Sequence, residues 1–415
     1  MNILTRRRFL AASGVTAAGA LGFGATQVNW SDLLAEGERD PLPDNAGVLV
    51  VVTLYGGNDG LNTVIPASDS AYQDARPELA YKADEVLDVG EGLGLNPGLK
   101  GLKDLWDSKK LAIVRGVGYP QPDHSHFRSM AIWQTASPKS PTRTGWLGRW
   151  LDATGDDPIR ALSVEPVLPP LLAGDHVAGA SLPVSGLQIP RGPLGTAFLG
   201  LGQPQPGECP DCARAAKSIA DLAEAARVLQ NARSNQDENP SEDEERNKGA
   251  SAGGRGALGA QLDLVAGLIE MGVPTRAYSV SLGGFDTHAD EKGTQQRLLT
   301  ELDKALAPFI DRMHKSDRGR NTIVLVYSEF GRRVRANASQ GTDHGTAGPA
   351  FLLGEKVNGG FYGTQPSLTD LDDGDLRETT DFRDIYATLL EKVLGADPGA
   401  ILSDHPGRVN GLIAT

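Results

Sequence analysis

The stretch GVLVVVTLYGGNDGLNTVIP, residues 47–66, decides which fold the sequence predicts. Residues 48–52 are all Val or Leu, and the apolar run ends shortly afterwards at Gly56 and Gly57. A continuous apolar run of this kind, ended by glycines, is typical of a strand buried on both faces, as strands of parallel sheets are. The stretch therefore predicts a parallel strand whose carboxyl end runs into a polar loop containing Asp59.

Strand-like and helix-like segments alternate along the rest of the chain. A helical pattern leads into a second apolar strand at 111–117, and a weaker strand is expected at 159–164. Beyond residue 256 the helix and strand patterns alternate again, as far as a strand at 321–331. This alternation predicts an α/β fold with a doubly wound, mostly parallel sheet and helices on both faces, in which ligands bind outside the carboxyl ends of the strands.

The predicted domain is interrupted by one segment of a different character. Residues 231–256 are charged and rich in Gly, with almost no apolar side chains. Such a composition cannot bury a core and predicts a disordered linker or surface insertion. We expect a single α/β domain over 46–415 that carries this insertion.

The N-terminal region, residues 1–26, resembles a twin-arginine export signal. It contains TRRRFL at 5–10, followed by a weakly apolar stretch of small residues. The alternative is a membrane anchor, but the 17 residues from 10 to 26 are marginal for the roughly 20 that span a bilayer. We expect export to the periplasm or beyond, the twin-arginine translocation machinery as a partner, and no stable membrane span.

The charge of the chain argues against one class of partner. The 53 acidic and 40 basic residues give a formal net charge of −13. A phosphate backbone would be repelled over most of such a surface, so we expect no nucleic-acid partner.

The two cysteines, Cys209 and Cys212, have C-x-x-C spacing. In an exported protein this spacing favours a structural disulfide. A zinc knuckle would need two further ligands nearby, and Asp211 would oppose the thiolate that redox catalysis requires.

Polar residues gather at the predicted strand ends. Asp59 lies in Asn-Asp-Gly, which is also a good turn sequence. Asp286 and His288 in GGFDTH are two residues apart, so in an extended loop they point the same way, as two ligands of one metal must. Surface hydrogen bonding is the alternative for this pair.

A helix is expected to begin within DHSHFRSMAIWQTA, residues 123–136, which follows the second strand. Its start favours an anion, because backbone N–H groups are unpaired there and the helix dipole is positive. Ser125 is either the N-cap of this helix or a nucleophile that His124 or His126 would activate as a base. Thr63 is a weaker candidate nucleophile.

The segment VYSEFGRRVRANASQGTDHGTAGPAFLLG, residues 326–354, carries the densest group of polar candidates. Its arginines can form a solvated face or an anion-binding cluster, because a guanidinium fits phosphate and sulfate oxygens. Asp343 and His344 are expected in a tight loop flanked by Gly341 and Gly345. His405 lies far along the chain, and we expect it to be a surface residue. The candidates in this segment are Glu329, Arg332, Arg333, Arg335, Asp343 and His344.

These motifs together resemble the bacterial family catalogued as domain of unknown function 1501. The resemblance rests on the twin-arginine signal, LYGGNDGLNTVIP, SHFRSMAIWQ, GGFDTH, SEFGRR and GTDHGTAGPAFLLG, and it covers nearly the whole chain. The family in turn resembles, distantly, the alkaline phosphatase and sulfatase superfamily. That resemblance implies a doubly wound α/β sheet with two adjacent divalent metals at the strand ends.

The resemblance also implies roles for individual residues. Asp59 and Glu329 correspond to aspartates of one metal site, and Asp286, His288 and His344 resemble the ligands of the other. Ser125 falls near the nucleophile, and residues 381–395 look like the segment that closes these folds. Phe330 stands where a histidine ligand is expected, and a phenyl ring has no lone pair for a cation. One competent site is therefore expected unless Asp343 or a histidine from 124–126 replaces the missing ligand.

Two functions follow as expectations. The first is an exported metal-dependent hydrolase of small anionic phosphate or sulfate esters. Its ion would be zinc or manganese, with calcium an alternative. The second is a non-catalytic binding or assembly protein on the same scaffold, for which the absence of any metal is an alternative.

Overall fold

The computed structural model describes residues 30–155, 157–165, 168–182, 258–403 and 405–414. The expected signal region, the segment 231–256 and the pair Cys209 and Cys212 lie outside these residues. Within the described residues, none of the helices combines the length and hydropathy that crossing a lipid bilayer requires.

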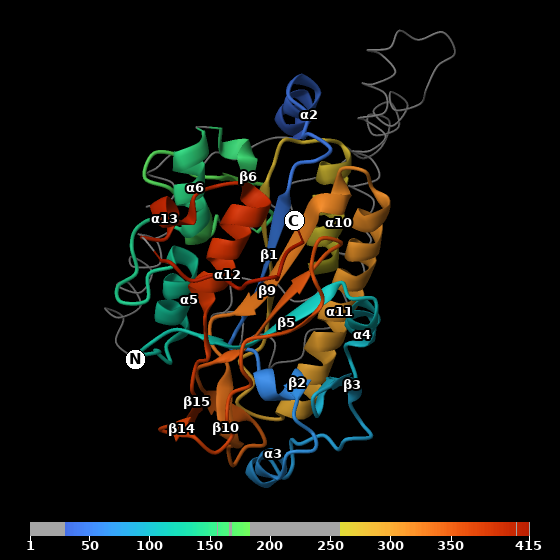
Figure 1. Ribbon diagram of the computed structural model, residues 1–415, viewed down its shortest axis with the longest axis vertical. Coiled ribbons are helices and arrows are strands. Elements are labelled where there is room, and N and C mark those ends of the chain that lie inside the picture. Colours follow the sequence, from blue (N-terminus) through green and yellow to red (C-terminus); the bar gives the residue numbers. More distant parts are fainter. Residues whose placement is uncertain (1–29, 156, 166–167, 183–257, 404, 415) are drawn as a thin grey trace, which may run out of the picture.

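A nine-stranded sheet forms the centre of the fold (Figure 1). The strand order is β13, β5, β12, β9, β1, β8, β6 and β7, and β16 also pairs with β5. The central strand pairs are parallel, and β12 is antiparallel to both of its neighbours. The strands are β1 (Val48–Tyr55), β5 (Leu111–Gly118), β6 (Ala161–Ser163), β7 (Ala180–Ser181), β8 (Ala277–Gly283), β9 (Thr322–Ser328), β12 (Gly348–Leu353), β13 (Gly360–Tyr362) and β16 (Thr380–Asp381).

Helices cover both faces of this sheet, as the sequence predicts (Figure 1). One face packs against α4, α10 and α11, and the other against α5, α6, α12 and α13. The helices are α2 (Trp30–Arg39), α3 (Ser70–Ala75), α4 (Lys100–Asp107), α5 (His126–Thr135), α6 (Trp146–Thr154), α10 (Leu258–Glu270), α11 (Glu291–Lys315), α12 (Phe382–Leu389) and α13 (Pro398–Ile401).

Strand β1 shows why the apolar run at its centre specifies this architecture. Val48, Val50 and Val52 enter the core on the α10 and α11 side, whereas Leu49 and Val51 enter the core on the other side. Successive side chains of a strand point to opposite faces, so only a strand covered on both faces buries every one of them. The predicted mostly parallel α/β sheet is thus confirmed.

Three small sheets lie beyond the carboxyl ends of the central strands (Figure 1). They are β2 (Val64–Ile65) with β4 (Leu93–Leu95) and β3 (Leu87–Gly90), β10 (Arg332–Ala336) with β11 (Thr342–His344), and β14 (Leu371–Asp372) with β15 (Asp375–Leu376). The β10–β11 pair matters most for the site, because it brings His344 to Asp286, which follows β8.

Gly56 and Gly57 turn the chain at the end of β1 in backbone conformations that favour glycine, with φ angles of +116° and +71°. A Cβ atom on Gly56 would lie 2.5 Å from the backbone nitrogen of Asp286, and one on Gly57 would collide with the ring of Phe330. The two glycines therefore allow the ends of β1, β8 and β9 to meet closely.

Candidate metal centre

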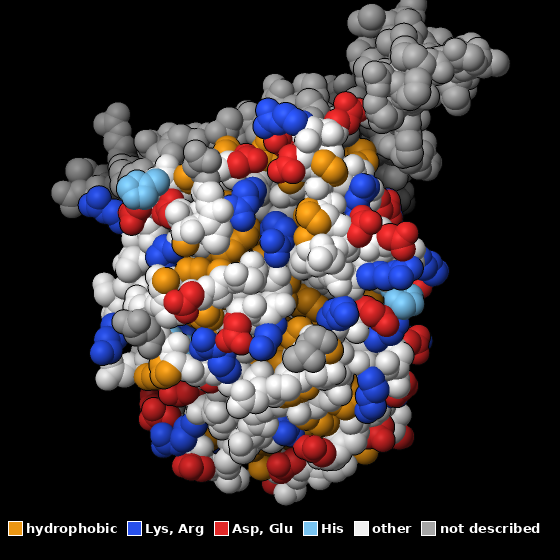
Figure 2. All heavy atoms as spheres, turned by 45° about the horizontal axis from the view of Figure 1, so that its top comes forward, with side chains coloured by type: hydrophobic (Ala, Val, Ile, Leu, Met, Phe, Trp, Pro, Cys, Tyr) orange, Lys and Arg blue, Asp and Glu red, His pale blue; other side chains and the backbone are white. Residues whose placement is uncertain are grey.

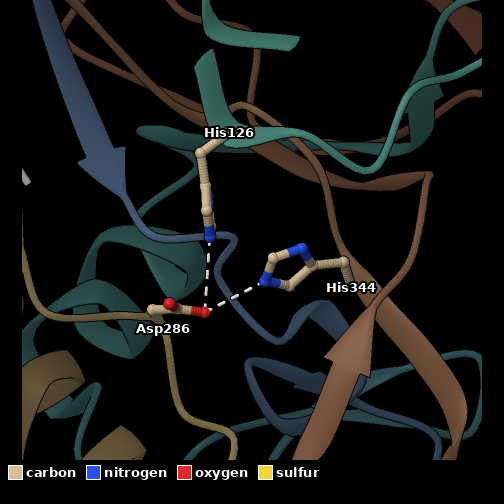
Figure 3. A group of neighbouring side chains, drawn as sticks. All are labelled: His126, Asp286 and His344. Atoms are coloured by element: carbon tan, nitrogen blue, oxygen red, sulfur yellow. Dashed lines mark hydrogen bonds and ion pairs between the residues drawn. The ribbon is translucent and has the colours of Figure 1, made fainter. Parts of the chain in front are cut away.

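Four side chains from three separate parts of the chain converge beyond the sheet. Asp286 and His288 lie in the loop that follows β8, His126 is the first residue of α5, and His344 ends β11. Figure 3 shows His126, Asp286 and His344 pointing toward one another from these elements. Ligand atoms of these three residues all lie within 4.8 Å of one another.

The Oδ1 atom of Asp286 is the centre of this group. It lies 3.0 Å from Nε2 of His288 and 3.1 Å from Nε2 of His344. Nε2 of His126 is 3.4 Å away, and the Nε2 atoms of His288 and His344 are 2.9 Å apart. Each of the three imidazoles thus turns the same nitrogen toward one small volume.

The opposite nitrogen of each ring faces an acceptor. Nδ1 of His126 lies 2.8 Å from Oε1 of Glu329, and Nδ1 of His344 lies 2.7 Å from the backbone oxygen of His124. Nδ1 of His288 is 3.5 Å from Oδ1 of Asp343. A proton on Nδ1 satisfies these acceptors, and a neutral ring then presents a lone pair from Nε2 to the centre.

Converging lone pairs repel unless a proton or a cation lies among them. Burial would lower the pKa of His126, but the carboxylates of Asp286 and Glu329 outweigh it and raise that pKa to about 9. Burial would raise the pKa of Asp286, but the neighbouring His126, His344 and Arg332 hold it well below its usual range. The pKa of His288 is lowered, mainly by burial. One carboxylate oxygen with three imidazole nitrogens around it is a donor set that fits a bound cation, which would take the place of the proton on His126.

Asp59, which the sequence predicts as a metal ligand, lies outside the group of converging side chains. Its side chain is fully buried, and Oδ2 forms an ion pair of 2.5 Å with Nη1 of Arg76. Its other oxygen caps a short turn by accepting from the backbone nitrogen of Leu61. The turn interpretation of Asn-Asp-Gly is thus confirmed, and Asp59 is not among the converging ligand atoms because Arg76 already neutralises it.

Glu329, also predicted as a metal ligand, contacts a histidine of the group instead of the centre itself. Its side chain is 1% exposed, with Oε1 accepting from the backbone nitrogen of Gly56 and Oε2 from the hydroxyl of Ser328. It therefore reaches the group only through His126. Asp343 similarly touches Nδ1 of His288, and its side chain is 61% exposed.

The three arginines do not form one surface cluster. Arg332 is buried, and its guanidinium donates to the backbone oxygens of residues 56, 57, 285 and 342 and to Asp286. The side chain is also shielded from solvent, so an anion at the surface cannot reach its guanidinium and the predicted anion-binding role of Arg332 is wrong. Arg333 is half-buried and lies near Asp373 and Asp375, whereas Arg335 is exposed.

Ser125 occupies the N-cap position of α5, as its sequence context predicts. Within the described chain its hydroxyl makes no capping hydrogen bond, and the residue is exposed. His124 precedes it and pairs with Asp375 at 2.7 Å between Nε2 and Oδ2. Thr63 is buried and donates to the backbone oxygen of Asp59, which removes it as a nucleophile.

Three buried charged residues around the centre were not predicted. Arg76 sits in a loop with no local pattern that marks it. Asp375 is 4% exposed and holds His124. Glu291, in the first turn of α11, hydrogen-bonds Thr342, and burial beside Asp59 raises its pKa to about 9. An acid at a helix start was the only visible signal for Glu291.

A family model described as a protein of unknown function, DUF1501, matches residues 204–414. None of the curated proteins matches the chain. Among solved structures, the chain is similar to a protein of the alkaline phosphatase superfamily from Vibrio parahaemolyticus, at 11% identity and a TM-score of 0.38, over 95% of this chain and 78% of that one. It is also similar to the phosphonate monoester hydrolase of Agrobacterium radiobacter, at 11% identity and a TM-score of 0.35, over 88% and 78%. At this level of similarity no residue of the site is carried over.

Proposed function

Since the chain belongs to the DUF1501 family of proteins of unknown function, we propose from its own site that it is an exported, metal-dependent hydrolase of phosphate or sulfate esters. The observation that supports this proposal is the convergence of Asp286, His288 and His344 on one small volume. A divalent metal bound there would polarise an ester oxygen and lower the pKa of a bound water.

The surroundings of the centre supply the other parts that such a reaction needs. Ser125 is the proposed nucleophile, exposed at the start of α5, where the positive end of the helix dipole favours an anionic substrate. His124 is the proposed base, and its ring is oriented by the buried carboxylate of Asp375. We propose the periplasm or the exterior as the place of action, after export through the twin-arginine machinery, with no nucleic-acid partner. Figure 2 shows a face on which acidic and basic side chains are interspersed.

A binding or assembly protein is the second candidate, and two observations favour it. The Phe330 ring lies 4.8 Å from the ring of His126 and 4.9 Å from that of His344, measured between centroids, so it covers one side of the centre. The Asp59–Arg76 ion pair also removes a carboxylate that a second metal would need. A site of this kind could bind a metal without turning over an ester.

Metal content and hydrolysis, measured on the same preparation, separate the two candidates. Protein exported by its own signal is analysed for bound metal and tested on chromogenic phosphate and sulfate monoesters. His288→Ala should lower both metal content and hydrolysis, whereas Ser125→Ala should abolish hydrolysis alone. His314→Ala, a change at an exposed histidine paired with Glu355, is the control and should alter neither. Stoichiometric metal without any hydrolysis in the unaltered protein would favour the binding protein.

A further inference from the structure

We infer that His126 is a fourth protein ligand, and that the centre holds a single transition metal by three imidazoles and one carboxylate. This inference rests on the metal of the proposed function but not on hydrolysis. It also reassigns His126, because a nitrogen that binds a metal is not available as a base.

The unsatisfied nitrogen of His126 is the first observation. Among the described residues, Nε2 of His126 is buried and has no hydrogen-bond partner, although it lies 3.4 Å from Oδ1 of Asp286. A buried polar atom without a partner is costly, and native proteins usually satisfy such atoms with protein, water or an ion. A metal at the centre would satisfy this nitrogen together with those of His288 and His344.

The spacing of the ligand atoms is the second observation. Four ligands about 2.0–2.1 Å from a tetrahedral zinc ion lie about 3.4 Å from one another. Four of the six separations among these ligand atoms are 2.9, 3.0, 3.1 and 3.4 Å. Small outward movements of the imidazoles would therefore open the group to the size that such an ion needs.

The outer contacts of the histidines are the third observation. Metal-binding histidines commonly donate their other N–H to a carboxylate or a backbone oxygen, which fixes the ring and its tautomer. Here Glu329, the backbone oxygen of His124 and Asp343 take those places. Glu329 is itself fixed by Gly56 and Ser328, so His126 is held by a rigid partner.

The ligand types determine which ions the centre prefers. Calcium takes six to eight oxygen ligands and magnesium keeps an octahedral oxygen shell, but three of the four ligand atoms here are imidazole nitrogens. Imidazole suits zinc, iron, copper and nickel. One ion per chain is expected, because Arg76 neutralises Asp59 and the ring of Phe330 lies against His126 and His344.

Equilibrium dialysis against zinc and the visible spectrum of the cobalt(II)-loaded protein test this inference. The unaltered protein should bind one zinc per chain, resist competition by millimolar calcium, and give a cobalt spectrum of low coordination number. His126→Asn should weaken zinc binding at least tenfold and change the cobalt spectrum. Glu329→Gln, which keeps an oxygen for His126 but removes its charge, should weaken zinc binding by about tenfold. His314→Asn should leave both measurements unchanged.

Several results would overturn the inference. Two ions per chain, displacement of zinc by calcium, or an unchanged cobalt spectrum in His126→Asn would each do so. Thermal unfolding of the metal-free variants shows whether they fold. If His126→Asn does not fold, Glu329→Gln is the variant that tests the inference. Zinc bound as expected without any ester hydrolysis would defeat the proposed hydrolase but leave the inference standing. Ester hydrolysis by the unaltered protein, together with unaltered zinc affinity in His126→Asn and Glu329→Gln, would overturn the inference but leave the proposed hydrolase standing.

Discussion

The carboxylate of Asp59 and the guanidinium of Arg76 form an ion pair in which neither side chain is exposed to solvent. Arg76 also donates to the backbone oxygens of Arg333 and Val334, so it ties the loop after β1 to strand β10. The loop and the strand that carries the chain toward His344 are thereby held together beside the candidate metal centre.

Removing one partner of this pair should destabilise the fold strongly. Arg76→Met would leave the buried Asp59 carboxylate unpaired, and breaking a buried pair in this way typically costs about 3–5 kcal/mol. Urea denaturation would measure the loss. The double change Arg76→Met with Asp59→Asn should be less destabilised than the sum of the two single changes, because it leaves no unpaired charge. A loss below about 1 kcal/mol in Arg76→Met would contradict this account.

The buried carboxyl of Glu165 should make stability depend on pH. Burial raises the pKa of Glu165 to about 7, despite hydrogen bonds from Ser279 and Ser281. Because this folded-state pKa lies above the usual value near 4.5, the protonated group stabilises the fold fully below about pH 4.5. That contribution is lost as the pH rises through about 7, and it amounts to about 3 kcal/mol.

Glu165→Gln isolates this effect. The free energy of unfolding of the unaltered protein should fall between pH 5 and pH 8, and the variant should lose the part of that fall that Glu165 contributes. The parts contributed by Glu291 and His126, whose pKa values are also raised, should remain. Glu78→Gln, at an exposed position, should behave like the unaltered protein. Equal pH dependence in Glu165→Gln would show that other groups are responsible.

Export should depend on the paired arginines of the N-terminal region, which lies outside the described residues. We expect Arg6→Lys with Arg7→Lys to leave the precursor in the cytoplasm, since the twin-arginine receptor reads that pair. Fractionation and immunoblotting would follow the protein, with Arg39→Lys as the control outside the signal. Continued export of the double variant would refute the twin-arginine assignment.

The segment 231–256, also outside the described residues, is proposed to be a solvated insertion. Limited proteolysis should then cut first within 233–254, as exposed polar segments are preferred sites. The two fragments should stay together on gel filtration, because β1 from the first half pairs with β8 and β9 from the second. Fragments that separate would indicate two independent domains instead.

The sequence by itself determined the architecture, since it depends on local and periodic properties. The apolar run at 48–52 requires cover on both faces of its strand, and the Asp-x-His spacing directs Asp286 and His288 the same way. Positions of candidate residues at strand ends followed from the same alternation of helices and strands.

Only the tertiary structure decided which partner each charged residue meets. Nothing in the sequence pairs Asp59 with Arg76 or His126 with Glu329, because these contacts depend on how loops far apart in the chain fold over one another. Arg332 looked like part of a solvated cluster, yet strand β10 turns it inward, where its guanidinium is satisfied by backbone oxygens. Pairing of buried charges is a property of the packed fold, since desolvation and geometry outweigh proximity in sequence.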